Sequence, residues 1–216
     1  MYTTLDDLIR FSGLTWKPEL NSTGEKLIAS AQRYVENYCG DERFGARIFR
    51  LEPDMQTETR YFDGNGKKRL YVGDIQNVET VSIGSVVQSG YFLYPPATQN
   101  SSHNSIELSQ AEGLAVFPFG QQNVAITSYF IYSAVVPPDI ELAVLKLATG
   151  MIKQHTDIDV KEVTSESLGD YRATYQSLDK IVDSIGIKEL LKPYVRSPEE
   201  GADDDTPKAT IGLRKI

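Results

Sequence analysis

The stretch Pro137-Pro138-Asp139-Ile140-Glu141-Leu142-Ala143-Val144-Leu145-Lys146-Leu147-Ala148 predicts a helix with a well-marked start. The two prolines end the preceding extended run, because a proline ring disfavours helix in the residue before it and removes a backbone donor. Asp139 then lies in the first helical turn, where its negative charge is stabilised by the helix dipole. We expect this helix to continue to about His155.

Apolar side chains cover an unusually wide arc of this helix. At about 100° per residue they span roughly 180–200°, whereas an ordinary surface helix needs an apolar stripe of little more than about 100°. Either a large core or neighbouring subunits must bury the surplus. The residues of the arc are Ile140, Ala143, Val144, Leu147, Ala148, Met151 and Ile152.

Composition places the chain among ordinary globular proteins. It has 216 residues, of which 40% are hydrophobic and 24% are charged, and this is typical of folded domains. The net charge of −8 argues against electrostatic binding of nucleic acid. A single cysteine, Cys39, excludes an intrachain disulfide framework and fits synthesis in a reducing cytoplasm. We find neither a membrane-spanning run nor the pattern of a signal peptide.

The hydrophobic periodicity changes along the chain and predicts an α+β fold. N- and C-terminal helices would pack together as a helical core, with an inserted antiparallel β domain and an extended C-terminal tail. The expected parts are an N-terminal helical part at 1–45, a β domain at 46–136, a C-terminal helical part at 137–196 and a flexible tail or arm at 197–216.

Helix signals are clear in the first part. Thr4 to Phe11 suits a short helix closed by Ser12-Gly13. A longer helix follows, with Ser22 and Glu25 at capping-box spacing and Gly40 as its stop. Near the end of the chain, apolar residues from Leu178 to Ile185 form another amphipathic face, which Gly186 interrupts.

Short runs of β-branched and aromatic residues predict strands in the second part. Asp63-Gly64-Asn65-Gly66 reads as a hairpin turn rather than a calcium loop, because Lys67 and Lys68 stand where the calcium motif needs a ligand oxygen and a glycine. The polar stretch from Gln99 to Asn104 is expected to be an exposed loop. The predicted strands contain 60–62, 69–72, 81–83, 91–94 and 123–130.

The chain offers no convincing catalytic constellation. His103 and His155 are its only histidines, and with Cys39 they cannot build a metal cluster at these separations. Cys39 falls on the apolar face of its helix, which favours a buried, inert thiol. We therefore expect no enzymatic activity, no cofactor and no metal site.

The order of several short motifs resembles the head–tail connector (adaptor) proteins of tailed bacteriophages, which dock beneath the portal ring. The likeness extends discontinuously to about residue 196. The motifs are Thr4-Leu5-Asp6-Asp7-Leu8-Ile9, the helix around Val35-Glu36-Asn37-Tyr38-Cys39-Gly40, Tyr61-Phe62-Asp63-Gly64-Asn65-Gly66, Val136-Pro137-Pro138-Asp139-Ile140, Glu166-Ser167-Leu168-Gly169-Asp170-Tyr171 and Leu190-Leu191-Lys192-Pro193-Tyr194-Val195-Arg196.

This resemblance implies a virion protein of the neck, made in the host cytoplasm. It would form a ring of about twelve subunits around a channel through which DNA passes without sequence-specific binding, with portal on one side and a tail or head-closure protein on the other. The portal-gripping arm would comprise Arg196, Ile211, Leu213, Arg214, Lys215 and Ile216. Neighbouring subunits would cover the surplus apolar surface at Ile140, Ala143, Val144, Leu147, Ala148 and Met151.

Two alternatives remain open from the sequence. The chain could be another neck component, such as a head-closure or tail-completion protein. It could also be a β-rich module that binds carbohydrate through its tyrosines, although strand packing explains most of those side chains.

Overall fold

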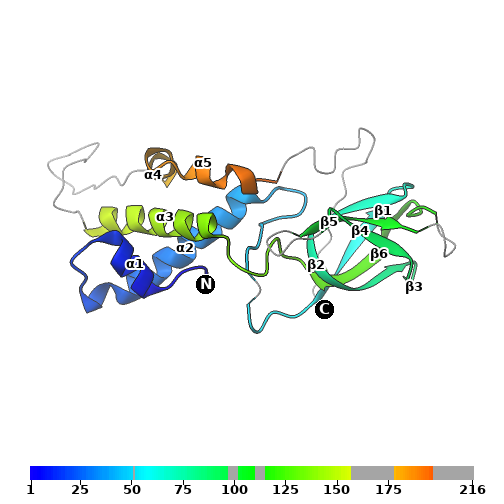
Figure 1. Cartoon of the computed structure of the whole chain (residues 1–216), viewed down its shortest axis with the longest axis horizontal. Coiled ribbons are helices and arrows are strands. Elements are labelled where there is room, and N and C mark those ends of the chain that lie inside the picture. The colour runs from blue at the N-terminus through cyan, green and yellow to red at the C-terminus, as the bar shows by residue number, and fades with distance from the viewer. Residues whose placement is uncertain (51, 97–101, 110–114, 157–177, 197–216) are drawn as a thin grey trace, which may run out of the picture. The chain divides into compact units, whose positions relative to one another are not determined.

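A computed structural model of the chain describes all residues except 51, 97–101, 110–114, 157–177 and 197–216 (Figure 1). Helices and a six-stranded antiparallel sheet confirm the α+β class. The chain divides into two compact units, which we call the helical unit and the β unit. The helical unit contains Met1–Val35 and Pro138–Tyr194, and the β unit contains Glu36–Pro137 with the chain from Val195 onward. None of the helices described has the length and apolar character needed to cross a membrane.

The first helix of the helical unit, α1 (Leu5–Ser12), is capped at both ends; its stop at Gly13 was predicted, whereas its N-terminal capping box was not. The Asp7 N–H donates to the Thr4 hydroxyl over 3.2 Å, and the Thr4 N–H donates to the Asp7 carboxylate over 3.0 Å. This reciprocal capping box satisfies two donors that the helix itself leaves unpaired. Gly13, at a φ of 65°, ends the helix in the left-handed conformation.

The second helix, α2 (Asn21–Cys39), begins earlier than the sequence indicated. A 3₁₀ turn, η1 (Pro18–Leu20), leads directly into it, so the predicted capping residues Ser22 and Glu25 lie inside the first turns. Proline at the start of a helical turn lacks an N–H that would be unpaired there anyway. The predicted stop is correct, since the helix ends before Gly40.

Helix α3 is the central element of the helical unit, because it packs against three other helices, α1, α4 and α5. Gly186, at a φ of 66°, separates α4 from α5, which agrees with the predicted interruption. The Tyr194 hydroxyl donates to the Asp139 carboxylate over 3.3 Å and ties the last helical turn to the start of α3. The bounds are α3 (Pro138–Thr156), α4 (Leu178–Ser184), α5 (Ile187–Leu191) and η3 (Lys192–Tyr194).

The β unit is built around its longest strand, β2. The strand order is β1-β6-β2-β5-β4, and β3 pairs with the last residues of β2. The first half of β2 pairs with β5 and the second half with β6, with a register irregularity in each ladder. The bounds are β1 (Glu58–Gly64), β2 (Arg69–Ile83), β3 (Val86–Gln88), β4 (Tyr91–Tyr94), β5 (His103–Leu108) and β6 (Gly120–Tyr129).

Three sequence predictions need correction in this unit. Residues 69–72 and 81–83 belong to one strand, β2, rather than two. His103 starts strand β5, although it was expected in a loop. The turn after Asp63 joins β1 to β2, but both strands pair with β6, so the turn does not close a hairpin. Turn composition reveals where the chain reverses, but not which strand later inserts between the two arms.

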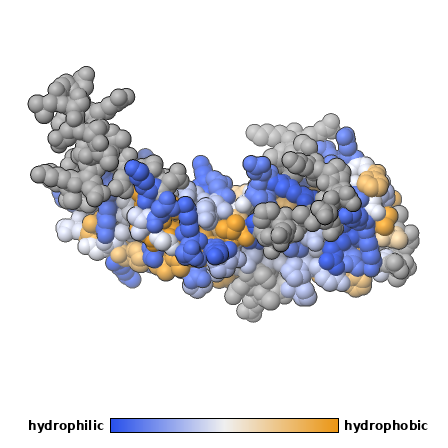
Figure 2. Space-filling model, turned by 90° about the horizontal axis from the view of Figure 1, so that it is seen from above, coloured by the Kyte–Doolittle hydropathy of each residue, from blue (hydrophilic) through white to orange (hydrophobic). Residues whose placement is uncertain are grey.

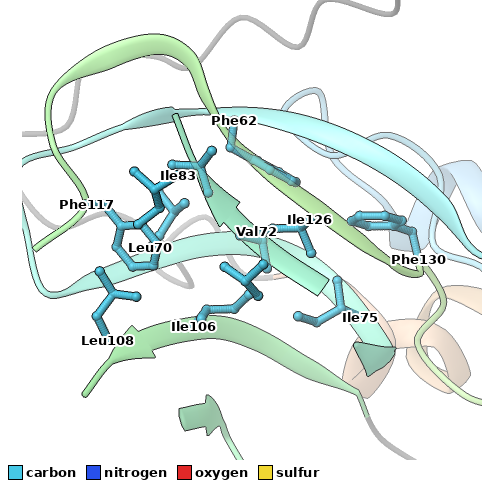
Figure 3. Packing of buried hydrophobic residues seen from close by; sticks show 12 residues of the cluster. Phe62, Leu70, Val72, Ile75, Ile83, Ile106, Leu108, Phe117, Ile126 and Phe130 are labelled. Carbon is cyan, nitrogen blue, oxygen red and sulfur yellow. The ribbon is translucent and has the colours of Figure 1, made fainter. Parts of the chain in front are cut away.

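The inward side chains of all these ladders form one apolar core (Figure 3). Alternation along β6 sends Val124 and Ile126 into it, and both are fully buried. Ile75 and Ile106 come from the paired strands β2 and β5, and Phe117 closes the core from the segment before β6. The core therefore joins the strands on both sides of β2 into a single packed unit.

The core makes a first prediction at Ile126. Replacing Ile126 with Ala leaves a cavity among packed side chains and should lower the free energy of unfolding by about 3 kcal/mol. Thr80→Ala, on the exposed side of the neighbouring strand β2, is the control and should stay within about 0.5 kcal/mol of the wild type. Urea unfolding followed by circular dichroism measures both; equal losses would show that Ile126 is not a core residue.

Candidate functional site

A buried carboxylate with two arginines is the most strongly organised polar site of the β unit. Asp74 comes from the middle of β2, Arg47 from the segment after α2, and Arg196 from the segment after η3. Arg47 donates to both Asp74 oxygens, through Nε over 2.9 Å and Nη2 over 3.0 Å. Arg196 donates to Asp74 through Nη2, and the Ser102 hydroxyl donates to the same carboxylate over 2.9 Å.

Further contacts hold Arg196 in this place. Its Nη1 lies 3.2 Å from Asp41 Oδ1, and its backbone N–H donates to the Cys39 carbonyl over 2.9 Å. Its guanidinium lies 5.3 Å from the centre of the Phe44 ring. The Arg196 side chain is 5% exposed and that of Asp74 is 4% exposed. Arg196 thus fixes the chain to the β unit immediately before the last twenty residues of the sequence.

The charges of this cluster determine its ionisation. Burial on its own would raise the pKa of Asp74, but the hydrogen bonds and positive charges of Arg47 and Arg196 outweigh it and lower the pKa below the ordinary value. Asp74 is therefore ionised at neutral pH. Removing one partner from such a buried ion pair is strongly destabilising, because the remaining charge is left without compensation.

The other residues considered for chemistry have ordinary structural surroundings. Cys39 is fully buried, and burial raises the pKa of its thiol to about 12 against a weaker opposing effect of Arg47. The predicted burial of this thiol is confirmed. His103 Nδ1 lies 2.8 Å from the Pro95 carbonyl oxygen. Within the described part of the chain, no three His, Cys, Asp or Glu side chains form a group that could hold a metal ion.

The predicted subunit-contact residues of α3 are covered by their own chain. Five of these six residues have 0% exposure in a single chain, namely Ile140, Ala143, Val144, Leu147 and Ala148. Only Met151 keeps part of its surface. This corrects the interpretation of the wide apolar arc, because a helix that packs against three others needs apolar surface on several sides.

The predicted portal-binding residues divide into two groups. Arg196 is buried in the cluster with Asp74, so its guanidinium is engaged within the chain, and the prediction for this residue needs correction. The remaining residues, Ile211, Leu213, Arg214, Lys215 and Ile216, lie outside the described residues.

Sequence reasoning missed Arg47 and Asp74, although one signal was present. Asp74 interrupts a strand whose neighbours Leu70, Val72 and Ile75 are all apolar. A charge inside a buried strand requires a partner of opposite charge. The sequence alone gave no means of finding the partners, since Arg47 and Arg196 lie 27 and 122 residues away along the chain.

Comparison with known proteins identifies the fold. The sequence matches no protein-family model and no curated protein. A chain in the neck of an empty GTA (gene transfer agent) particle computed with C6 symmetry has a similar structure, with a TM-score of 0.50 and 13% identity over 91% of this chain and 90% of that chain. A chain in the neck of a native GTA particle computed with C12 symmetry aligns with a TM-score of 0.42 and 15% identity, over 83% and 85%.

The cluster leads to a second prediction, at Asp74. Asp74→Asn keeps the shape of the side chain but leaves two buried arginines without their counter-charge, and should lower the free energy of unfolding by about 3 kcal/mol or more. The control is Glu58→Gln, which removes the carboxylate of a partly exposed pair with Arg60 and should cost less than about 1 kcal/mol. Thermal and urea unfolding at pH 7 measure both variants.

The same variant also tests the pH dependence. Because the folded-state pKa of Asp74 lies below its unfolded value of about 3.8, its contribution is present above pH 4 and is lost as the pH falls through the folded-state pKa. The wild type should therefore lose stability more steeply in acid than Asp74→Asn. Parallel acid profiles would contradict the assignment of a lowered pKa.

Proposed function

We propose that this chain is a structural protein of the neck of a tailed phage or phage-like particle, an adaptor that forms a ring between the portal and the tail. The observation that carries the proposal is the fold shared with a GTA neck chain along almost the full length of both chains. The motifs that resemble those of head–tail connector proteins, in the same order along the chain, support the same role from the sequence.

The placement of Arg196 fits an adaptor that reaches its partner with a C-terminal arm. An arm transmits force to its subunit only if its first residue is fixed. Arg196 supplies such a fixed point through Asp74, Asp41 and the Cys39 carbonyl. In this proposal Arg196 anchors the arm, and the residues beyond it, which include Ile211, Leu213 and Arg214, bind the portal.

A second neck role, that of a head-closure or tail-completion protein, is the alternative, because C6 symmetry is satisfied by six-fold and twelve-fold rings alike. The similar chain with a TM-score of 0.50 belongs to a neck computed with C6 symmetry. Both roles require a closed ring with one interface repeated around an axis, so the number of subunits separates them.

Ring formation is the direct test of the proposed function. The purified full chain, alone or mixed with the portal protein of the same particle, should form closed rings in negative-stain electron micrographs. Twelve-fold class averages support the adaptor, and six-fold averages support the tail-side role. A chain that forms no ring with or without portal contradicts both.

The arm makes a separate prediction. Deleting residues 206–216 should abolish co-sedimentation with portal rings, because it removes the apolar and basic residues at the end of the chain. The matched control neutralises the acidic residues just before them, as Asp203→Asn with Asp204→Asn and Asp205→Asn, and should still bind. Undiminished binding by the truncated chain would exclude the arm as the portal contact.

A further inference from the structure

The turn that leads from β1 to β2 contains the one Asn-Gly pair of the sequence, Asn65-Gly66. In an unfolded chain, an asparagine before a glycine readily loses ammonia, because no side chain on the following residue obstructs its backbone nitrogen. That nitrogen attacks the asparagine Cγ and forms a cyclic imide. In a folded chain, the contacts of the two residues decide whether this reaction can occur.

The local structure requires both residues of the pair. Asn65 Oδ1 accepts from the Lys67 N–H over 3.0 Å, and Asn65 Nδ2 donates to the Arg69 carbonyl over 2.9 Å. Such bonds to nearby backbone suit asparagine to turns. Gly66 has a φ of 71°, and a Cβ there would lie 2.3 Å from Phe119 Cε2. A less reactive pair would therefore lose the hydrogen bonds of the turn or clash with the Phe119 ring.

Residues 117–123, which we call the covering segment, hold the reacting nitrogen in place. The Gly66 N–H donates to the Phe117 carbonyl over 2.7 Å, and the Phe117 N–H donates to the Lys67 carbonyl over 2.8 Å. Phe117 is fully buried in the core, which fixes these hydrogen bonds to the β unit. Imide formation requires the Gly66 nitrogen to give up its proton and approach Asn65 Cγ. Both steps are opposed while that N–H donates to Phe117.

The covering segment also holds the preceding pair, Asp63-Gly64. The Gly64 N–H donates to Asn123 Oδ1 over 2.7 Å, and Asp63 Oδ1 accepts from the Gln122 N–H over 2.7 Å. Asn123 Nδ2 donates in turn to the Pro118 carbonyl over 2.8 Å. Asp-Gly pairs isomerise through the same imide. Two adjacent reactive pairs are thus held by hydrogen bonds to one stretch of chain.

We propose that Asn65 is a latent deamidation site, which the covering segment keeps unreacted in the folded chain. In the reaction the Gly66 nitrogen forms a bond to Asn65 Cγ, and the bond from Cγ to the side-chain nitrogen breaks. The side-chain nitrogen leaves as ammonia and takes the proton that the Gly66 nitrogen gives up. Water then opens the imide at either carbonyl, which yields aspartate or isoaspartate without any oxidant or reductant.

The modification acts in one direction. Both products lack the Nδ2 donor to the Arg69 carbonyl and carry an added negative charge, and isoaspartate also lengthens the backbone by a methylene group. A turn that has opened long enough to react therefore cannot restore its original hydrogen bonds. The proposal concerns the β unit of a single chain and does not depend on the proposed neck role.

Phe119 offers a variant that uncovers the pair and leaves the core intact. Its ring packs against Gly66 but is 77% exposed, and it is one of several apolar side chains at the surface of the β unit (Figure 2). Phe119→Ala therefore removes the cover of Gly66 alone. The matched control is Phe92→Ala, which removes a ring that is 55% exposed on β4.

The experiment compares deamidation rates of the full chain. Wild type and variants are incubated in mildly alkaline buffer, with and without urea, and circular dichroism verifies folding in the absence of urea. Trypsin cleaves after Arg60 and Lys67, so peptide 61–67 reports on Asn65, its single asparagine. Mass spectrometry measures the conversion of its amide to an acid, and chromatography separates aspartate from isoaspartate.

We expect Asn65 to react at least about tenfold faster in the unfolded wild type than in the folded one, because an opening free energy of about 1.4 kcal/mol leaves about a tenth of the chains reactive. Phe119→Ala should raise the rate in the folded chain at least about threefold, whereas Phe92→Ala should change it less than about twofold. Asn123→Ala, which removes the hydrogen bonds to Gly64 and Pro118, should also raise it.

Two results would overturn the proposal. Equal rates in the folded and unfolded wild type would show that the fold does not protect the pair. Equal rates in folded Phe119→Ala and Phe92→Ala would show that the protection does not come from the covering segment. Should Phe119→Ala fail to fold, Asn123→Ala takes its place in this comparison.

Discussion

The carboxylate of Asp74 is the constraint on which the β unit depends. A buried ion costs several kcal/mol unless partners of opposite charge and hydrogen bonds compensate it, and here Arg47, Arg196 and Ser102 all point at one group. The three partners come from separate parts of the chain. The site is therefore complete only when Arg196, which follows the last helix, packs against strand β2, 122 residues earlier in the sequence. This contact couples the segment after the last helix to the sheet.

The backbone beside Asp74 explains how such a site fits into a strand. Gly73 has a φ of 78°, a conformation that favours glycine. A Cβ at Gly73 would lie 2.9 Å from Phe44 Cγ, so the absence of a side chain lets the Phe44 ring pack against the strand. The Arg196 guanidinium also packs against that ring. The bend, the aromatic ring and the ion cluster are thus parts of one arrangement, located at the register irregularity of the β2–β5 ladder between Tyr71 and Ile75.

The sequence revealed local structure well and tertiary pairing poorly, for physical reasons that particular residues show. Thr4, Asp7 and Gly13 act on their own turn, so the capping of α1 was predictable. Strand β5 was missed because His103 and Asn104 are polar and its alternation begins only at Ser105. The hairpin expected after Asp63 failed because β6, almost sixty residues later, lies between the two strands. The partners of Asp74 could not be predicted, because Arg47 and Arg196 are distant in the sequence and meet Asp74 only in the tertiary structure.

The wide apolar arc of α3 does not by itself indicate a subunit contact. A wide arc indicates how many elements pack on a helix, and for α3 those elements belong to its own chain. A surface that must meet water before assembly and exclude it afterwards needs a different composition, with few charges to desolvate and few large aliphatic groups to expose. Ile140 and Leu147, which are fully buried within a single chain, have the composition of a permanent core.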